Sequence, residues 1–446
     1  MKILHITPHM GGGVGAVLRS YLLHESNFAD QRTHYLSSLE NINEQSRNFL
    51  GEIGVTYYEN MYQKQTELFR KIEACDIVLI HWWNHPLLQD LLMNSQLPPN
   101  RMLIWCHISG LHSPNVMCEY ILELPDEFIF TTPLSNFVPC IESYKNSRHA
   151  TFDTIWSTCG HESISKFCSP RPQANNDKSK EIRIGYIGNL DQTKLSGDFF
   201  KILAQIEPRQ VRTTVIGPPT DFFLNLIRES SNMEVEYLGY VSEEEKFRQL
   251  NSFDLFFYPL ARNHYGTCDQ AIQEAMVFGV PVIAFNNPME SYMIKNGETG
   301  FVARNFTEFV KLLQGLIEDQ EMRLRLSIKS QEVAKDCYSI VKMADSWSLK
   351  FDENLKRQKK LRIPLSGILG RQLSPSEVMV KSLGIYGGLF SEYIQATKSG
   401  WKSKIESQIS ALTSLPNWTS SSKSTVHHYK RFFNDENLNF WSRLML

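Results

Sequence analysis

Two features of residues 264–285, HYGTCDQAIQEAMVFGVPVIAF, suit the binding of a charged ligand. The loop HYGT precedes a helical pattern, and the free N–H groups at a helix N-terminus attract anions such as phosphate. Glu274 lies two turns beyond Thr267 on the same helix face, where its carboxylate can accept hydroxyl groups. The spacing therefore predicts a ligand that carries a phosphate and hydroxyls. The alternative is that Glu274 is an ordinary solvated helix residue.

The same stretch predicts the elements that position these groups. Thr267 and Gln270 have the spacing of a capping box, which predicts a helix that begins near Cys268. Gly279 and Pro281 predict its end, because glycine favours the C-terminal cap and proline cannot continue a helix. The apolar, β-branched run VPVIAF then predicts a buried strand.

Three other loops follow predicted strands. The loop PHMGGGVGAVLRSYL, which contains Gly13, can bring backbone N–H groups close to an anion, or can be a plain tight turn. Its spacing does not give the dinucleotide fingerprint. His107 ends an apolar strand and is either a hydrogen-bonded core residue or a site residue. Lys194 has the compact charge that suits a phosphate, but most lysines are solvated surface residues.

Short apolar runs alternate with helical patterns along the chain, which predicts parallel strands and crossover helices. The pattern runs through KILHIT, THYLSSL, VTYYE, CDIVLIHWW, RMLIWCHI and EFIFTT, and restarts after the polar stretch SPRPQANNDKSKE with IRIGYIGNL, RTTVIGPP, VEYLGY, FDLFFYPL and VPVIAF. We therefore expect an α/β fold of two doubly wound, Rossmann-like domains that face a cleft. The predicted domains are residues 1–170 and 181–345, followed by a mainly helical extension over residues 346–446.

Composition narrows the class of protein. The 446 residues carry a formal net charge of -2, which lacks the basic footprint expected of a nucleic-acid-binding protein. The eight cysteines form no C-x-x-C pair and no zinc-like cluster, as in a cytosolic protein with reduced thiols. No run of about 18 apolar residues occurs, so we expect a cytoplasmic protein or one bound peripherally at the inner membrane face.

These motifs together resemble the GT-B-fold glycosyltransferases, and most of all the retaining enzymes of glycosyltransferase family 4. The resemblance rests on GGGVG, on HISG, on GNLDQTK in place of the family's G-R-L-x-x-x-K, on VEYLGYVSEEE and on QEAMVFGVPVIAFNNPMESYMIKNGETGFV. It covers about residues 1 to 350. It implies a hexosyltransferase-like enzyme that moves a sugar from a nucleoside-diphosphate sugar, with UDP as the expected nucleotide, to a glycan, lipid-linked or protein acceptor.

The resemblance also implies roles for single residues. Lys194 would pair with the donor diphosphate, Glu274 with the ribose hydroxyls, and His107 would face the transferred sugar, so these three residues are the expected catalytic set. The backbone around Tyr240 and Val241 would hold the nucleobase. The glycine loop at Gly13 and the loop residues His264, Tyr265, Thr267 and Cys268 complete the expected donor site.

Two positions depart from the family's pattern. The family usually has a glutamate eight positions before Glu274, where this chain has Gly266, and an arginine where it has Asn189. The loss of a carboxylate and a guanidinium changes the sugar contacts and part of the diphosphate clamp. His264, Tyr265 and Thr267 can replace some of them, and the backbone amides of residues 266–268 can stabilise phosphate charge.

We expect neither a metal ion nor a cofactor at the site, because the sequence has no Asp-x-Asp motif. Two rival functions remain open: a non-catalytic nucleotide-sugar-binding or scaffold subunit, and a nucleotide-sugar epimerase. The basic and aromatic stretches beyond residue 350, such as NLKRQKKLRIPLSGILGR, are either a peripheral contact with anionic lipid or the ordinary packing of a terminal subdomain.

Overall fold

The computed structural model of the protein describes residues 1–28, 31–170, 181–207, 211–230 and 235–446. These residues divide into two compact units, Met1–Ser157 with Val341–Leu446, and Thr158–Ile340. Most of the predicted linker at residues 169–181 lies outside the described residues, and so does the boundary that we placed there.

The first unit is built on a six-stranded sheet in the order β3-β2-β1-β4-β6-β7, with every pair parallel. Its strands are β1 (Lys2–Thr7), β2 (Thr33–Ser38), β3 (Thr56–Tyr58), β4 (Ile77–Trp82), β6 (Met102–Cys106) and β7 (Glu127–Phe130). A separate antiparallel pair joins β5 (Leu97–Asn100) to β14 (Lys360–Arg362). The order of the sheet reverses between β1 and β4, which is the switch point where ligands of such folds bind.

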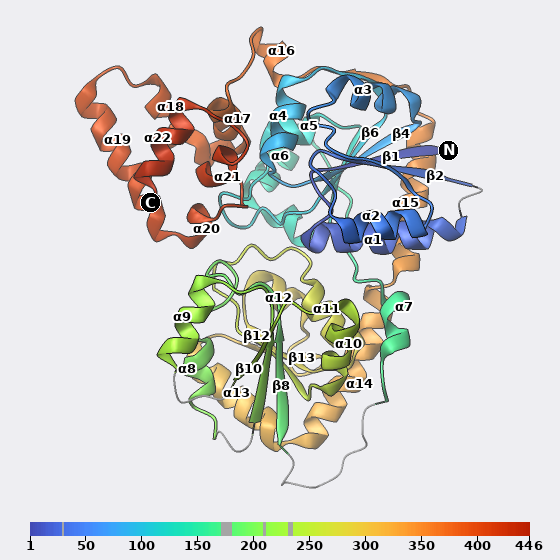
Figure 1. Ribbon diagram of the computed structural model, residues 1–446, viewed down its shortest axis with the longest axis vertical. Coiled ribbons are helices and arrows are strands. Elements are labelled where there is room, and N and C mark those ends of the chain that lie inside the picture. Colours follow the sequence, from blue (N-terminus) through green and yellow to red (C-terminus); the bar gives the residue numbers. More distant parts are fainter. Residues whose placement is uncertain (29–30, 171–180, 208–210, 231–234) are drawn as a thin grey trace. The chain divides into compact units, whose positions relative to one another are not determined.

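Helices cover both faces of this sheet (Figure 1). They are α1 (Gly12–Glu25), α2 (Glu44–Glu52), α3 (Gln65–Ala74), α4 (Pro86–Asn94), α5 (Glu119–Glu123), α6 (Pro139–Arg148) and α15 (Ile340–Leu355), with short 3-10 turns η1 (Ser26–Phe28) and η2 (Pro133–Phe137).

Alternating strand residues supply the two faces. Leu4 and Ile6 of β1 belong to the core with α3 and α4, whereas Leu36 of β2 packs with Leu18 and Leu22 of α1.

The C-terminal helices share the core of the first unit. They are α16 (Leu365–Leu369), α17 (Pro375–Ser382), α18 (Gly388–Gln395), α19 (Ser399–Ala411), α20 (Pro416–Thr419), α21 (Val426–Lys430) and α22 (Glu436–Leu444), with η5 (Gly384–Gly387) and η6 (Leu412–Ser414). Figure 1 shows them beside α4, with which α16 and α17 make contact. Val378, Phe390 and Trp441 are buried in the same apolar cluster as Leu88 of α4. The segment that we expected as a helical extension therefore packs against α4 and shares the apolar core of the first unit.

The second unit repeats the architecture with a parallel sheet in the order β10-β9-β8-β11-β12-β13. Its strands are β8 (Ile182–Ile187), β9 (Val211–Ile216), β10 (Val235–Gly239), β11 (Leu255–Tyr258), β12 (Val282–Phe285) and β13 (Gly300–Ala303). The order reverses between β8 and β11. The loops that follow these two strands carry Lys194 and residues 264–268.

Figure 1 shows α8 and α9 on one side of this sheet, and α10, α11 and α14 on the other. The helices of the unit are α7 (His161–Ile164), α8 (Phe199–Leu203), α9 (Asp221–Glu229), α10 (Glu243–Ser252), α11 (Gln270–Val277), α12 (Pro288–Met293), α13 (Phe306–Glu318) and α14 (Gln320–Cys337), with the turn η3 (Ser165–Phe167). Phe199, Phe257 and Phe309 pack edge to face between α8, β11 and α13.

The prediction of two Rossmann-like α/β sheets with a mainly helical C-terminal segment is confirmed. Each predicted apolar run contains a strand of one sheet or the other. The strand β13, with the sequence GFVA, was not predicted. All eight cysteines are free thiols, as expected. Within the described ranges, no helix has the length and apolarity needed to span a membrane.

Candidate functional site

Lys194 and Asp269 meet at the switch point of the second sheet. Lys194 follows β8 and Asp269 follows β11, and the Lys194 Nζ lies 3.3 Å from the Asp269 Oδ1. The Tyr258 hydroxyl donates to the same oxygen at 2.8 Å. Burial lowers the pKa of the Lys194 ammonium, but the Asp269 carboxylate opposes this and holds the pKa above its usual value. A fixed positive charge therefore lies at the carboxyl edge of the sheet.

The helix α11 begins later than we predicted. It starts at Gln270 with Asp269 as its N-cap, and not near Cys268. No side chain forms a cap hydrogen bond, and the Thr267 hydroxyl donates instead to the Tyr265 carbonyl at 3.4 Å. The capping-box prediction was wrong because Asp269 takes the cap position and directs its carboxylate to Lys194. The predicted helix end is confirmed, since Gly279 has a φ of 64°.

Glu274 is paired with a lysine that we did not single out. Its Oε1 accepts a hydrogen bond from the Lys246 Nζ of α10 at 2.6 Å, and the two side chains are only 14% and 20% exposed. Burial lowers the pKa of Lys246, while the Glu274 carboxylate raises it above its usual value. Glu274 is therefore not an ordinary solvated helix residue. Lys246 gave no sequence signal because it lies in SEEEK, a stretch typical of a charged surface helix.

A glycine at position 266 leaves room for the His264 ring. A Cβ atom built on Gly266 would lie 2.5 Å from the His264 Nε2, so a side chain there would displace the ring. The same Nε2 lies 3.1 Å from the Glu290 Oε1 of α12. Where the glycosyltransferases that the sequence resembles have a glutamate, this chain therefore has room for the buried His264 ring, which lies next to the Glu290 carboxylate. Glu290 was not predicted from the sequence, because it lies 24 positions beyond Gly266 along the chain.

His264, Asp269 and Glu290 offer ligand atoms within 4.8 Å of one another, a spacing that a divalent cation can bridge. The Lys194 ammonium already neutralises Asp269. Burial raises the pKa of Glu290, His264 lowers it and Asp269 raises it, and the net shift is upward. The Lys194 ammonium therefore places a positive charge beside these three side chains.

The remaining predicted donor residues lie on the loops after the strands. Tyr240 follows β10 and is 79% exposed, and Val241 beside it is half-buried. The Asn189 side-chain amide donates to the Asp191 carboxylate at 2.5 Å. The backbone carbonyl of Asn189 accepts a hydrogen bond from the Tyr186 hydroxyl. Asn189 therefore braces its loop and brings no positive charge to the site. The expected nucleobase contact of residues 240–241 stays a prediction.

The glycine loop of the first unit is partly structural. The helix α1 begins at Gly12, so Gly13 lies in its first turn. A Cβ on Gly15 would lie 1.9 Å from the Met10 carbonyl oxygen, which only glycine avoids. Close packing of the loop against α1 explains Gly15, and Gly13 stays a predicted donor residue.

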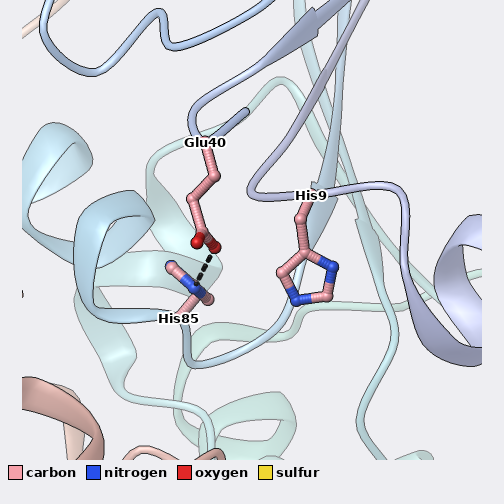
Figure 2. Close-up of side chains that lie close together, drawn as sticks. All are labelled: His9, Glu40 and His85. Carbon is pink, nitrogen blue, oxygen red and sulfur yellow. Dashed lines mark ion pairs between the residues drawn. The ribbon is translucent and has the colours of Figure 1, made fainter. Parts of the chain in front are cut away.

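A cluster of His9, Glu40 and His85 lies at the carboxyl edge of the first sheet, after β1, β2 and β4. Figure 2 shows the three side chains converging, with Glu40 and His85 paired. The His85 Nε2 lies 3.0 Å from the Glu40 Oε1. None of these three residues was predicted as a site residue, although each follows a predicted strand.

The protonation of His9 decides what this cluster can bind. The Gly11 N–H donates to the His9 Nδ1 at 3.1 Å, so the proton of the neutral ring sits on Nε2. If a metal ion bound the Nε2 atom, the proton of the neutral ring would have to sit on Nδ1. That proton would then point at the Gly11 N–H, which needs an acceptor there. Burial lowers the pKa of both His9 and His85, and both rings are therefore neutral at pH 7. The arrangement suits hydrogen bonding around Glu40 better than metal binding.

His107 lies directly after β6, half-buried beside the Trp105 ring. Its Nε2 is 3.2 Å from the Nδ1 of His81 on β4. Burial lowers the pKa of His107 to about 3. His107 therefore combines the two interpretations that the sequence left open, because one ring nitrogen is hydrogen-bonded inside the unit while the residue is only half-buried.

Part of the second unit is similar to known glycosyltransferases. Residues 170–333 match the model described as glycosyl transferases group 1. A stretch of 77 residues is 39% identical to an uncharacterized glycosyltransferase of Haemophilus influenzae, and it covers 17% of this chain and 22% of that protein. The chain therefore matches about a fifth of the length of this relative. These matches support a glycosyltransferase of the GT-B fold.

Solved structures share the architecture over most of the chain. Anabaena HepE in complex with UDP and glucose has a TM-score of 0.59 at 15% identity, over 79% of this chain and 100% of HepE. A glycosyltransferase from Rickettsia africae has a TM-score of 0.60 at 12% identity, over 80% and 99% of the two chains. Sucrose-phosphate synthase from Thermosynechococcus elongatus gives 0.57 at 16%, over 79% and 99%. The fold is that of the GT-B enzymes.

Proposed function

We propose that this chain is a retaining glycosyltransferase of family 4, which transfers a sugar from a nucleoside-diphosphate sugar to an acceptor hydroxyl. The observation that carries the proposal is the Lys194 ammonium, which Asp269 and Tyr258 hold at the switch point of the group 1 domain. The complexes of HepE with UDP and glucose and with UDP-glucose support UDP as the nucleotide and a hexose as the sugar.

In this proposal the donor diphosphate binds next to Lys194 and the start of α11. The difficult step is the departure of the nucleotide, so a preorganised positive charge stabilises the transition state more than the ground state. Glu274 binds the ribose hydroxyls and His107 contacts the sugar. The acceptor is a glycan, a lipid-linked glycan or a protein.

The direct test is incubation of the purified protein with a panel of UDP-sugars, with and without candidate acceptors. Transfer with retained anomeric configuration supports the proposal. Binding of the donor without hydrolysis or transfer would instead indicate a scaffold subunit, a rival that the loss of the acid at Gly266 and of the cation at Asn189 favours. A new nucleotide sugar formed without any acceptor would indicate an epimerase.

We expect transfer to persist in excess chelator. Lys194 and the N–H groups at the start of α11 supply the charge that a divalent cation supplies in other enzymes. The measurement is the initial rate after dialysis against EDTA, with and without added Mn²⁺ or Mg²⁺. Complete loss of activity that either ion restores would contradict metal independence, and His264, Asp269 and Glu290 would then be the first ligands to test.

The basic stretch beyond residue 350 mostly makes contacts within the first unit. Arg357 pairs with Glu127, Arg362 with Asp126, and the Lys359 Nζ donates to the Cys75 carbonyl. The apolar side chains Ile363, Ile368 and Leu369 around α16 are nevertheless 53%, 64% and 47% exposed. A peripheral contact with lipid, if the acceptor is lipid-linked, is therefore best assigned to this exposed apolar group.

Replacing Ile368 and Leu369 together with aspartate should weaken binding to anionic vesicles, because the change removes apolar area and adds negative charge. The measurement is co-sedimentation with vesicles that contain phosphatidylserine. Leu349→Asp, at a site 66% exposed on α15 of the same unit, is the matched control. Equal binding by both variants and the wild type would leave the apolar group without a membrane role.

A further inference from the structure

Four adjacent strands of the first sheet each place a histidine on the same face. They are His34 of β2, His5 of β1, His81 of β4 and His107 at the end of β6. The register pairs His34 with Ile3, His5 with Leu79, and His81 with Trp105, so each histidine lies two residues further along its strand than the one before. A step of two residues keeps the side chain on one face. The four rings therefore cross the sheet on a diagonal.

The ring nitrogens are within hydrogen-bond distance all along this diagonal. The His107 Nε2 lies 3.2 Å from the His81 Nδ1, the His81 Nε2 lies 3.0 Å from the His5 Nδ1, and the His5 Nε2 lies 2.8 Å from the His34 Nδ1. The His34 Nε2 lies 3.1 Å from the Oε2 of Glu25 on α1. We refer to His107, His81, His5, His34 and Glu25 as the histidine chain.

The inner end of the chain is charged and held in place. Arg32 donates to the Glu25 carboxylate at 2.9 Å, and also donates to the Ser348 hydroxyl. Burial raises the pKa of Glu25, but the hydrogen bond from His34 and the charge of Arg32 outweigh burial and hold the pKa below its usual value. An ionised carboxylate can only accept, so the His34 Nε2 must carry a proton.

This condition leaves two consistent proton arrangements. With His34 neutral, every ring carries its proton on Nε2 and donates to the next ring toward Glu25, and the His107 Nδ1 is an acceptor. With His34 doubly protonated, its Nδ1–H donates to His5 and the order reverses, so that His5, His81 and His107 all carry their proton on Nδ1. The two arrangements differ by one proton.

We propose that the histidine chain is a proton relay, in which a proton taken up at the His107 Nδ1 appears as a positive charge on His34 beside Glu25. His107 passes its Nε2 proton to the His81 Nδ1, His81 passes its own to His5, and His5 passes its own to the His34 Nδ1. One proton enters and none leaves, and the three outer rings only exchange tautomers. His107 thereby acts as a base while the charge is held at the other end of the chain.

Through the relay, His107 can act as a base although burial lowers the pKa of its own ring. Burial disfavours a positive charge on the His107 ring itself, whereas the His34 ring lies beside the Glu25 carboxylate, with 3.1 Å between His34 Nε2 and Glu25 Oε2. The proton donor rests on the proposed function: the acceptor hydroxyl loses its proton as its oxygen bonds to the anomeric carbon and the bond from that carbon to the diphosphate breaks. Among the described residues, Tyr21 of α1 also packs against the chain: its ring contacts His5 and His34, and burial raises its pKa far above its usual value.

The test follows the ring protons directly by NMR of protein labelled with ¹⁵N-histidine, over about pH 8 to 5, where imidazoles titrate. In the wild type, the His107 Nδ1 and the His34 Nδ1 should gain their protons with one shared midpoint. Glu25→Gln should move that midpoint down by about 1–3 pH units at both rings, because the carboxylate charge that favours the imidazolium is lost. His81→Phe should separate the two titrations. His24→Gln, next to Glu25 on the same helix, is the control that should leave the midpoint unchanged.

Independent titration of His107 and His34 in the wild type would overturn the relay, and so would a His107 midpoint that Glu25→Gln leaves in place. The second criterion stands even if His81→Phe does not fold. Because the NMR titration needs neither donor nor acceptor, its outcome is independent of whether the protein proves to be a transferase. If both proposals hold, Glu25→Gln should also shift the acid limb of the kcat profile and leave the donor KM unchanged.

Discussion

Lys194→Ala should lower kcat about 100-fold to 1,000-fold, which is the loss seen when one preorganised group that stabilises developing negative charge is removed. The donor KM should rise as well, because the ammonium also attracts the diphosphate of the ground state. Steady-state kinetics with a UDP-sugar measures both effects. Lys201→Ala is the matched control, since this lysine of α8 is 73% exposed and should be neutral.

The same substitution leaves the buried Asp269 carboxylate without its cation. Breaking a buried ion pair from one side costs about 3–5 kcal/mol of folding free energy, so the variant's folding must be checked by thermal melting. The pKa of Asp269 is held below its usual value in the folded wild type, so this contribution is present at neutral pH and is lost as the pH falls through the folded pKa. The stability difference between variant and wild type should therefore shrink in acid. A folded variant with wild-type kinetics would place the donor site elsewhere.

Glu274→Gln should raise the donor KM roughly 10-fold to 100-fold and change kcat little. Hydrogen bonds to ribose hydroxyls change little during the reaction, and a hydrogen bond to a charged group is worth about 1.5–3 kcal/mol. Glutamine is preferred to alanine because its amide oxygen can still accept from the Lys246 ammonium, which would otherwise lose its partner. Glu244→Gln, an exposed acid on α10, is the control.

The substitution Lys246→Met tests whether Glu274 binds the donor or whether the Lys246–Glu274 pair only holds α10 against α11. If Glu274 contacts the ribose, Lys246→Met should leave much of the donor affinity in place, because the carboxylate remains. An equal rise in KM for Lys246→Met and Glu274→Gln would mean that the pair positions α10 against α11, and that neither side chain touches the donor.

The sequence by itself determined the two sheets and the loops that follow their strands. A run such as VPVIAF is apolar throughout and has the length of a strand, so only a sheet covered on both faces can bury it. The sequence could also show that Lys194 follows a predicted strand and that Glu274 lies on a predicted helix, because these positions depend on local spacing.

The tertiary structure decided the partners of these residues. Three ion pairs join residues of different elements: Asp269 with Lys194, Lys246 with Glu274, and Glu290 with His264. The local patterns SEEEK and PMESYM do not predict such pairs. The sequence likewise predicted a mainly helical C-terminal segment but not the surface against which it packs, which includes α4 of the first unit.

The histidine chain is the clearest example of a feature that the sequence alone could not predict. Its four histidines span residues 5 to 107 and look, one by one, like satisfied core residues. They form a chain because the strand order is β2-β1-β4-β6 and because each register is offset by two residues. Strand order and register depend on how whole faces pack against helices, which is a property of the folded unit and not of any one segment.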